Sequence, residues 1–90
     1  MSLKYIVLDA PGGEAPVIFP RSFYHSYVAG LFSGMTVLGA GFVEIGDDVE
    51  GGVRCYGTSS SLRIESRGAV DTELVKAVGA AKAPILPDDV

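Results

Sequence analysis

The chain has 90 residues and a formal net charge of −4, and it contains one cysteine and one histidine. A chain of this length forms one domain, and a single cysteine excludes an intramolecular disulfide and a four-cysteine zinc site. The net negative charge argues against direct nucleic-acid binding, and no apolar run approaches the 18 residues of a membrane span. Because the cysteine is unpaired, we expect a cytoplasmic protein.

The first two predicted elements are short strands at 4–8 and 17–19, joined by a hairpin. The unbroken apolar run of the first strand indicates burial on both of its faces. Glycine tolerates the backbone angles of tight turns, so Gly12 and Gly13 are predicted to form the centre of the hairpin. Two facing pairs follow from this register, Leu8 with Val17 and Ile6 with Phe19.

Residues 23–32 carry the clearest helical pattern, with Ser22 as N-cap and Gly34 just after the C-terminus. The apolar side chains recur at helical spacing and are Phe23, Tyr24, Tyr27, Val28, Leu31 and Phe32. We expect this stripe to supply most of the core. The alternative is a partner-binding or dimer face, because four aromatic side chains are many for so small a domain.

The segments 36–45 and 53–57 are predicted to be antiparallel strands on either side of an acidic turn. Glycines at positions 39 and 41 indicate a bulge or a close approach by another backbone. Matching side chains predict four facing pairs: Glu44 with Arg54, Ile45 with Val53, Val43 with Cys55, and Phe42 with Tyr56. The core-facing residues are then expected to be Val43, Ile45, Val53 and Cys55, and the other four share the outer face.

Alternation over 62–65 predicts a further strand, which we pair with 53–57. Arg54 would then lie between Glu44 and Glu65 in an ion-pair ladder. A second helix is predicted over 70–81, with a stripe formed by Val70, Leu74, Val75 and Val78. Residues 1–82 are expected to form the domain, and 83–90 a loose tail.

These elements predict an α+β fold in the order β-β-α-β-β-β-α. An antiparallel sheet of about five strands is expected to carry both helices on one face.

The sequence holds no catalytic constellation. His25 is the only histidine, and its neighbour Ser26 points elsewhere on a helix, so we expect a surface or packing role for His25. Cys55 falls on the predicted core face, where a thiol is not activated. The acidic turn at 47–50 lacks the spacing of a calcium loop. We therefore expect no enzyme activity, no cofactor and no metal.

Cationic and aromatic residues of the C-terminal half indicate an interaction surface instead. Three arginines, Arg54, Arg63 and Arg67, are close in sequence, and Tyr56 lies among them. Arginine and tyrosine are enriched in protein interfaces. The candidate interaction residues are Arg54, Tyr56, Arg63, Arg67, Phe42 and Tyr24.

The run 4–9, Lys-Tyr-Ile-Val-Leu-Asp, is followed by Pro-Gly-Gly-Glu and Pro-Val-Ile-Phe-Pro, and the later motifs include Gly-Phe-Val at 41–43 and Tyr-Gly at 56–57. In these motifs the chain resembles small uncharacterised proteins from phages and prophages of proteobacteria. The resemblance implies a phage-derived accessory protein and carries over no catalytic residue.

Our hypothesis is a small cytoplasmic protein-interaction module that forms a homodimer or binds another protein. One alternative is an acidic inhibitor that occupies a nucleic-acid site on a host protein, which requires carboxylates gathered on one face. The other is a small-molecule anion binder or minor enzyme, in which Arg54, Tyr56 and Arg63 face the ligand.

Overall fold

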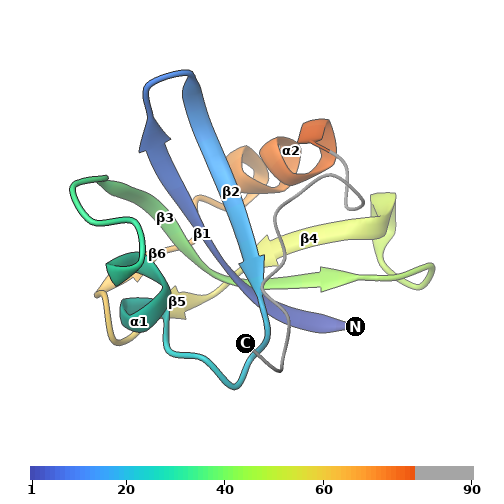
Figure 1. Ribbon diagram of the computed structural model, residues 1–90. Helices are drawn as coiled ribbons and strands as arrows, with labels where there is room; N and C mark the ends of the chain where they lie inside the picture. Colours follow the sequence, from blue (N-terminus) through green and yellow to red (C-terminus); the bar gives the residue numbers. More distant parts are fainter. Residues whose placement is uncertain (79–90) are drawn as a thin grey trace.

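A computed structural model describes residues 1–78 of the chain (Figure 1). The elements in chain order are β1 (Ser2–Ala10), β2 (Gly13–Phe19), α1 (His25–Gly30), β3 (Val37–Ile45), a 3-10 turn (Glu50–Gly52), β4 (Val53–Tyr56), β5 (Thr58–Ser59), β6 (Ile64–Glu65) and α2 (Ala69–Val78). The predicted α+β class, with antiparallel strands and two helices, is confirmed. The predicted tail at 83–90 and the predicted end of the second helix lie outside the described residues.

The main sheet has four strands in the order β2-β1-β3-β4, and β5 and β6 form a separate two-stranded sheet. All four predicted pairs between β3 and β4 are confirmed, from Phe42 with Tyr56 to Ile45 with Val53. The predicted pairing of 62–65 with β4 is wrong, because Glu65 faces Thr58. Gly57, with φ 82°, turns the chain out of the main sheet directly after β4. The ladder that linked Arg54 to Glu65 is therefore absent.

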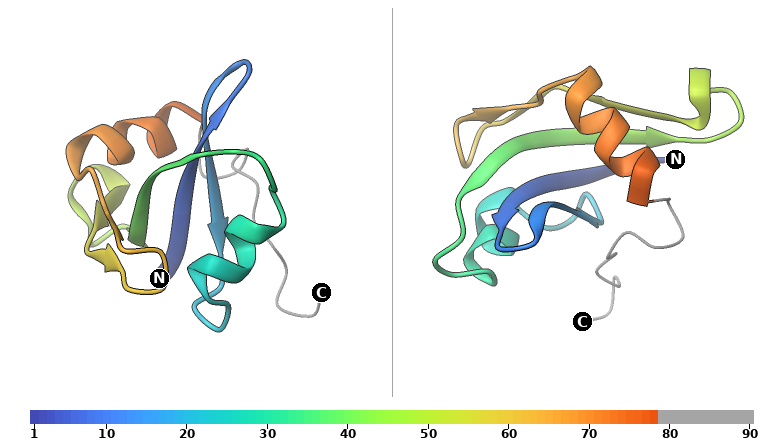
Figure 2. Two further views of the ribbon diagram at one scale, coloured as in Figure 1. Left: turned by 90° about the vertical axis from the view of Figure 1, so that its left-hand side faces the viewer. Right: turned by 90° about the horizontal axis from the view of Figure 1, so that it is seen from above.

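The two helices pack against opposite faces of the sheet, not against one face as predicted (Figure 2). Along β1, Tyr5 and Val7 belong to the core that contains Val75 of α2. The alternate side chains of the same strand, from Ile6 to Leu8, belong to the core that contains Val28 of α1. Successive side chains of a strand point to opposite faces, so the unbroken apolar run of β1 needs a cover on each side.

The hairpin between β1 and β2 has a register two residues away from the predicted one. Ile6 faces Val17, and Leu8 faces Ala15, because the connection is the two-residue turn Pro11–Gly12. The predicted facing pairs are therefore wrong, yet each side chain keeps its face, since a shift of two residues preserves the alternation. As expected from its prolines, β2 is an edge strand.

Helix α1 is shorter than predicted and buries a different side. It begins after Tyr24, with no side-chain cap, so Ser22 is not the N-cap. His25 and Val28 are buried, whereas Tyr24 is 73% exposed and Tyr27 56% exposed. The aromatic stripe is therefore not the main core contribution. The helix packs through His25, whose ring Nε2 lies 2.8 Å from the carbonyl oxygen of Gly41, and this contact turns the tyrosines outward.

Helix α2 buries a carboxylate instead of the first residue of its predicted apolar stripe. Val70 is 54% exposed, and Asp71 is fully buried. The Tyr5 hydroxyl and the backbone N of Arg67 donate to Asp71 Oδ2 at 2.6 and 2.9 Å, and Arg67 Nε donates to Oδ1 at 2.7 Å. A carboxylate tolerates burial only when such partners satisfy it, so this cluster fixes α2 on β1.

Both glycines of β3 are placed where a side chain cannot fit, and the predicted bulge is present opposite Val7 and Leu8. A Cβ at Gly41 would overlap the carbonyl oxygen of Tyr56 in the neighbouring strand. A Cβ at Gly39 would overlap Oδ2 of Asp71 and lie 3.1 Å from Nε of Arg67. The close approach at Gly41 is by backbone, as predicted, and the one at Gly39 is by the buried carboxylate.

We predict that Gly39→Ala lowers the free energy of unfolding by about 1–3 kcal/mol, the usual cost of overpacking a close-packed site. Gly12→Ala is the matched control, because nothing lies within 4 Å of a Cβ built there. Urea unfolding followed by circular dichroism measures both variants. Equal stabilities for the two would contradict the placement of Asp71 against Gly39.

Candidate interaction surface

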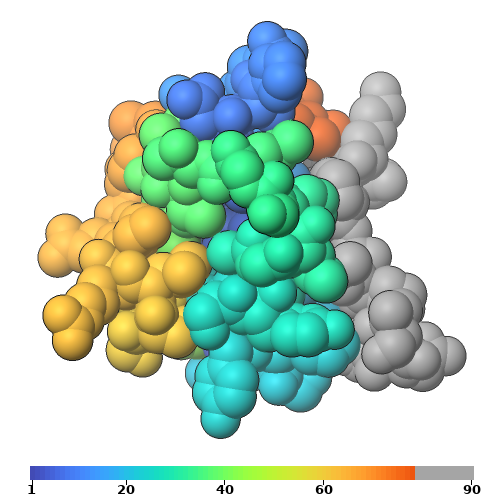
Figure 3. All heavy atoms as spheres, turned by 60° about the vertical axis from the view of Figure 1, so that its left-hand side comes forward, coloured from blue at the N-terminus to red at the C-terminus, as the bar shows by residue number. Residues whose placement is uncertain are grey.

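One side of the main sheet is only partly covered by α1. Alternation places Phe42 of β3 and the pair Arg54 and Tyr56 of β4 on this side, since their neighbours in sequence face the α2 core. Arg21, from the loop after β2, joins them. We call the four residues Arg21, Phe42, Arg54 and Tyr56 the aromatic face. Figure 3 shows that the segment of β5 and β6 lies beside α1, and Ser26 N donates there to Ser61 Oγ at 3.2 Å.

The side chains of the aromatic face are stacked on one another. The guanidinium carbon of Arg54 lies 4.4 Å from the ring centre of Tyr56, and that of Arg21 lies 4.9 Å from the ring centre of Phe42. The two rings are 5.9 Å apart and tilted by 31°. Cations over aromatic rings are attracted to the negative ring faces. The stack therefore holds four side chains in place before any partner arrives, which lowers the entropy cost of binding.

Three of the six candidate residues from the sequence meet in this stack, namely Phe42, Arg54 and Tyr56. Tyr24 lies near its margin, where Lys4 Nζ is 5.7 Å from the Tyr24 ring centre. Sequence reading missed Lys4 and Arg21. The alternation of Lys4 with the buried residues of β1 could have placed Lys4 on this side of the sheet. No local sequence pattern around Arg21 indicates that its loop returns over Phe42.

The other two candidates lie elsewhere. Arg67 is on the α2 side, where it forms ion pairs of 2.7 Å with both Glu14 and Asp71. The hydrogen bond that Arg67 donates to Glu14 raises the pKa of Arg67 above its usual value. Arg63 lies between β5 and β6 with φ 57°, in the left-handed region. The expectation that Arg54, Arg63 and Arg67 share one surface is not met for Arg67.

Two cations, Lys4 of β1 and Arg21 of the loop after β2, lie on this side of the sheet. Lys4 Nζ donates to the carbonyl oxygen of Phe23 at 2.7 Å, and Arg21 Nη1 donates to Ser2 Oγ at 2.8 Å. Burial, and then the repulsion from Arg21, lower the pKa of Lys4. Two like charges are thus held near each other, and no carboxylate of residues 1–78 forms an ion pair with either of them.

Carboxylates gather near the turn between β3 and β4. A shallow depression is lined by Arg54 together with Glu44, Asp48, Val49 and Glu50. Because three of these five residues are acidic, the depression beside Arg54 repels a small anion. This observation counts against the anion-binder alternative, whose remaining residues Tyr56 and Arg63 do not line it. In the stretch 1–78, no cluster of three or more histidine, cysteine or acidic side chains is arranged for a metal ion.

His25 packs between the aromatic face and the α1 core, not on the surface. Its ring meets Phe19 at 5.5 Å and Phe42 at 5.9 Å, both edge to face. Burial lowers the pKa of His25, and the charge on Lys4 lowers it further, against the opposing effect of its bond to Gly41. His25 therefore positions Phe42 as a neutral donor, and its closest partners are rings and a backbone carbonyl.

We predict that the free energy of unfolding decreases as the pH falls from 7 to 5. The unfolded chain takes up a proton at His25 below about pH 6.5, whereas the folded protein resists it, so protonation favours unfolding. His25→Gln keeps an amide donor for Gly41 and removes this titration. Urea unfolding at several pH values should give a flatter profile for the variant; parallel profiles would refute the assignment.

Cys55 belongs to the core, as its predicted face indicated, and it is 4% exposed. Burial raises the pKa of its thiol to about 11, against the smaller opposing effect of Thr72. A thiol in this state is neither a ready nucleophile nor a ready metal ligand.

We predict that iodoacetamide at pH 8 modifies Cys55 about 100-fold more slowly in the folded protein than in urea, since little of the buried thiol is ionised. Mass spectrometry of time points measures both rates. Comparable rates would show that the thiol is accessible and ionised, contrary to its placement.

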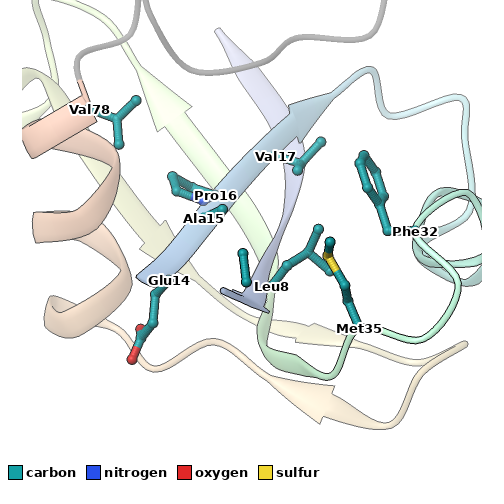
Figure 4. Close-up of a pocket in the computed structure, with 9 residues that line it drawn as sticks. Leu8, Glu14, Ala15, Pro16, Val17, Phe32, Met35 and Val78 are labelled. Carbon is teal, nitrogen blue, oxygen red and sulfur yellow. The ribbon is translucent and has the colours of Figure 1, made fainter. Parts of the chain in front are cut away.

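A second hollow of about 350 Å³ lies along β2, between the turn after α1 and the end of α2 (Figure 4). Its walls are almost entirely apolar and include Leu8, Val17, Phe32, Met35 and Val78. Glu14 is at its rim, but its carboxylate is bound to Arg67. The hollow offers no free polar group of the described chain for catalysis.

Comparisons with family models, curated proteins and solved structures found no match to this chain. No helix within residues 1–78 is long and apolar enough to cross a membrane.

Proposed function

We propose that this protein is a small non-enzymatic interaction module that binds a protein partner through the aromatic face. The observation that carries the proposal is the stack of two rings between two guanidinium groups, Arg21–Phe42 and Tyr56–Arg54, on a side of the sheet that α1 leaves partly open. Tyrosine and arginine with adjacent apolar surface are the residues that contribute most to protein interfaces.

The chemistry of the remaining polar groups supports a binding role over catalysis. His25 is buried against two aromatic rings, and Cys55 is buried with a raised pKa. Asp71 is fully engaged by Tyr5 and Arg67. Each of these groups thus has a packing or hydrogen-bonding role that stabilises the fold.

The acidic-inhibitor alternative would use the carboxylates at the end of the β3–β4 hairpin. Asp47, Asp48 and Glu50 are exposed there, but Glu14 and Asp71 are bound to Arg67 on the other side of the sheet. Within residues 1–78, the acidic groups of this turn form a small cluster, and two further carboxylates are paired with Arg67, which does not favour an array resembling a nucleic-acid backbone.

We predict that a photo-reactive benzophenone amino acid at position 56 forms specific protein cross-links. The same group at position 70 is the matched control, because Val70 is 54% exposed on α2, away from the aromatic face. Cross-linking is measured by gel electrophoresis and mass spectrometry, with the purified protein and in cells that produce it. Adding Arg54→Ser should weaken the cross-links from position 56, since it removes the cation over the neighbouring ring.

Equal cross-linking from the two positions, or none from position 56, would contradict the proposed function. Cross-links made from Asp48 but not from position 56 would favour the acidic-inhibitor alternative.

A further inference from the structure

The apolar hollow along β2 reaches both faces of this strand. Successive residues of a strand point to opposite faces, and the wall of the hollow includes the consecutive residues 14–17. Figure 4 shows Val78 on one side of β2 and Phe32 and Met35 on the other. Strand β2 is also at the edge of the sheet, so its outer backbone groups have no strand neighbour within residues 1–78. An occupant that fills the hollow therefore passes along the edge of β2 and contacts both faces.

The chain itself leads into this hollow. Val78, the last described residue of α2, is part of the wall, and residues 79–90 follow it in the sequence. In this segment, Ile85 and Leu86 form the one adjacent pair of large apolar side chains. The link from Val78 to Ile85 spans about 23 Å when extended, close to the length of β2 with its seven residues. The pair can thus reach the hollow along the whole of β2.

Two prolines suit this apolar pair to an extended path along an edge. Pro84 precedes the pair and Pro87 follows it. Proline fixes its own φ and favours an extended conformation of the residue before it. In an extended segment Ile85 and Leu86 point to opposite sides, which matches a hollow that opens to both faces of β2. Because the prolines restrict the free segment, docking costs less conformational entropy, and the tether raises the effective concentration of the segment.

We propose that residues 84–87 of the same chain occupy this hollow, with Ile85 and Leu86 packed on opposite sides of the edge of β2. The docked segment ties the end of α2 to the turn after α1, and it covers backbone groups that could otherwise pair with another chain. This arrangement differs from the loose tail that the sequence alone predicts.

A small molecule is a less suitable occupant. Ligand sites contain a few polar groups that orient the ligand in an otherwise apolar pocket. In this hollow the carboxylate of Glu14 is engaged by Arg67, and the other described wall residues are apolar. Such a wall matches the side chains of an apolar segment whose direction is already set by its link to Val78.

Nuclear Overhauser effects in the wild-type chain test the proposal directly. With isotope-labelled protein, we expect contacts from the methyl groups of residues 85 and 86 to the Phe32 ring and to the Met35 methyl group. An equimolar mixture of labelled and unlabelled chains distinguishes one copy from two, because an isotope filter then passes only contacts between copies. We expect the filter to remove every contact of this set.

A paired substitution in the same segment adds a matched control. Ile85→Ser together with Leu86→Ser should abolish docking, so the resonances of Phe32 and Met35 should shift from their wild-type positions. Asp88→Ser removes no apolar side chain and should leave the contacts and these resonances unchanged. Circular dichroism, and the contacts between β1 and β2, verify that each variant folds.

The proposal is overturned if the wild type shows no contact from residues 85 and 86 to the hollow, or if the double variant leaves Phe32 and Met35 unchanged. Contacts that pass the isotope filter would mean that a second copy fills the hollow, and docking within one chain would be wrong. No residue of the aromatic face lines the hollow, so these outcomes leave the proposed function to the cross-linking from position 56.

Discussion

The buried carboxylate of Asp71 is the constraint on which most of this structure depends. Its charge is satisfied only if Tyr5 on β1 and Arg67 before α2 both reach it. Arg67 in turn binds Glu14 on β2, so one charged cluster links α2 to the edge strand and to the strand beside it. The same carboxylate occupies the space that a side chain at Gly39 would need. Removing one partner from a buried charge is costly, which makes these elements depend on each other.

This anchoring also determines which surface stays open. Helix α2 is held on one side of the sheet, and the other side of β1 is left to α1, which has only six residues. Val28 covers the part around Ile6 and Leu8 together with Phe23, Phe32, Leu62 and Ile64, and the ring of Phe42 meets that of His25. The cations of Arg21 and Arg54 lie on the two rings that remain. The aromatic face is thus left beside α1 because this helix is short and β1 is packed on both of its faces.

The net charge of −4 does not correspond to a uniformly acidic surface, because the charged side chains are unevenly distributed. Some carboxylates, such as Asp71 and Glu14, are neutralised inside the Arg67 cluster. Other carboxylates, Glu44, Asp48 and Glu50, line the depression beside Arg54, and the cation Arg21 is bound to Ser2, which faces Glu44 across the sheet. Charges of both signs therefore lie close together on this side of the sheet, and a partner is favoured only in orientations that avoid like-charged contacts.

The sequence by itself determined the elements that rest on local alternation and facing pairs. The four strands of the main sheet, the register of β3 with β4 and the burial of Cys55 followed from it, because a slip of one residue there would exchange core and surface. Only the tertiary structure decided the opposite placement of the helices, the outward turn of Tyr24 and Tyr27, and the separate sheet of β6. Each of these depends on contacts between residues far apart in the chain, such as Tyr5 with Asp71, His25 with Gly41 and Arg21 with Phe42. Helical spacing predicts an apolar stripe, but hydrogen bonds between residues far apart in the sequence determine which side of the helix is buried.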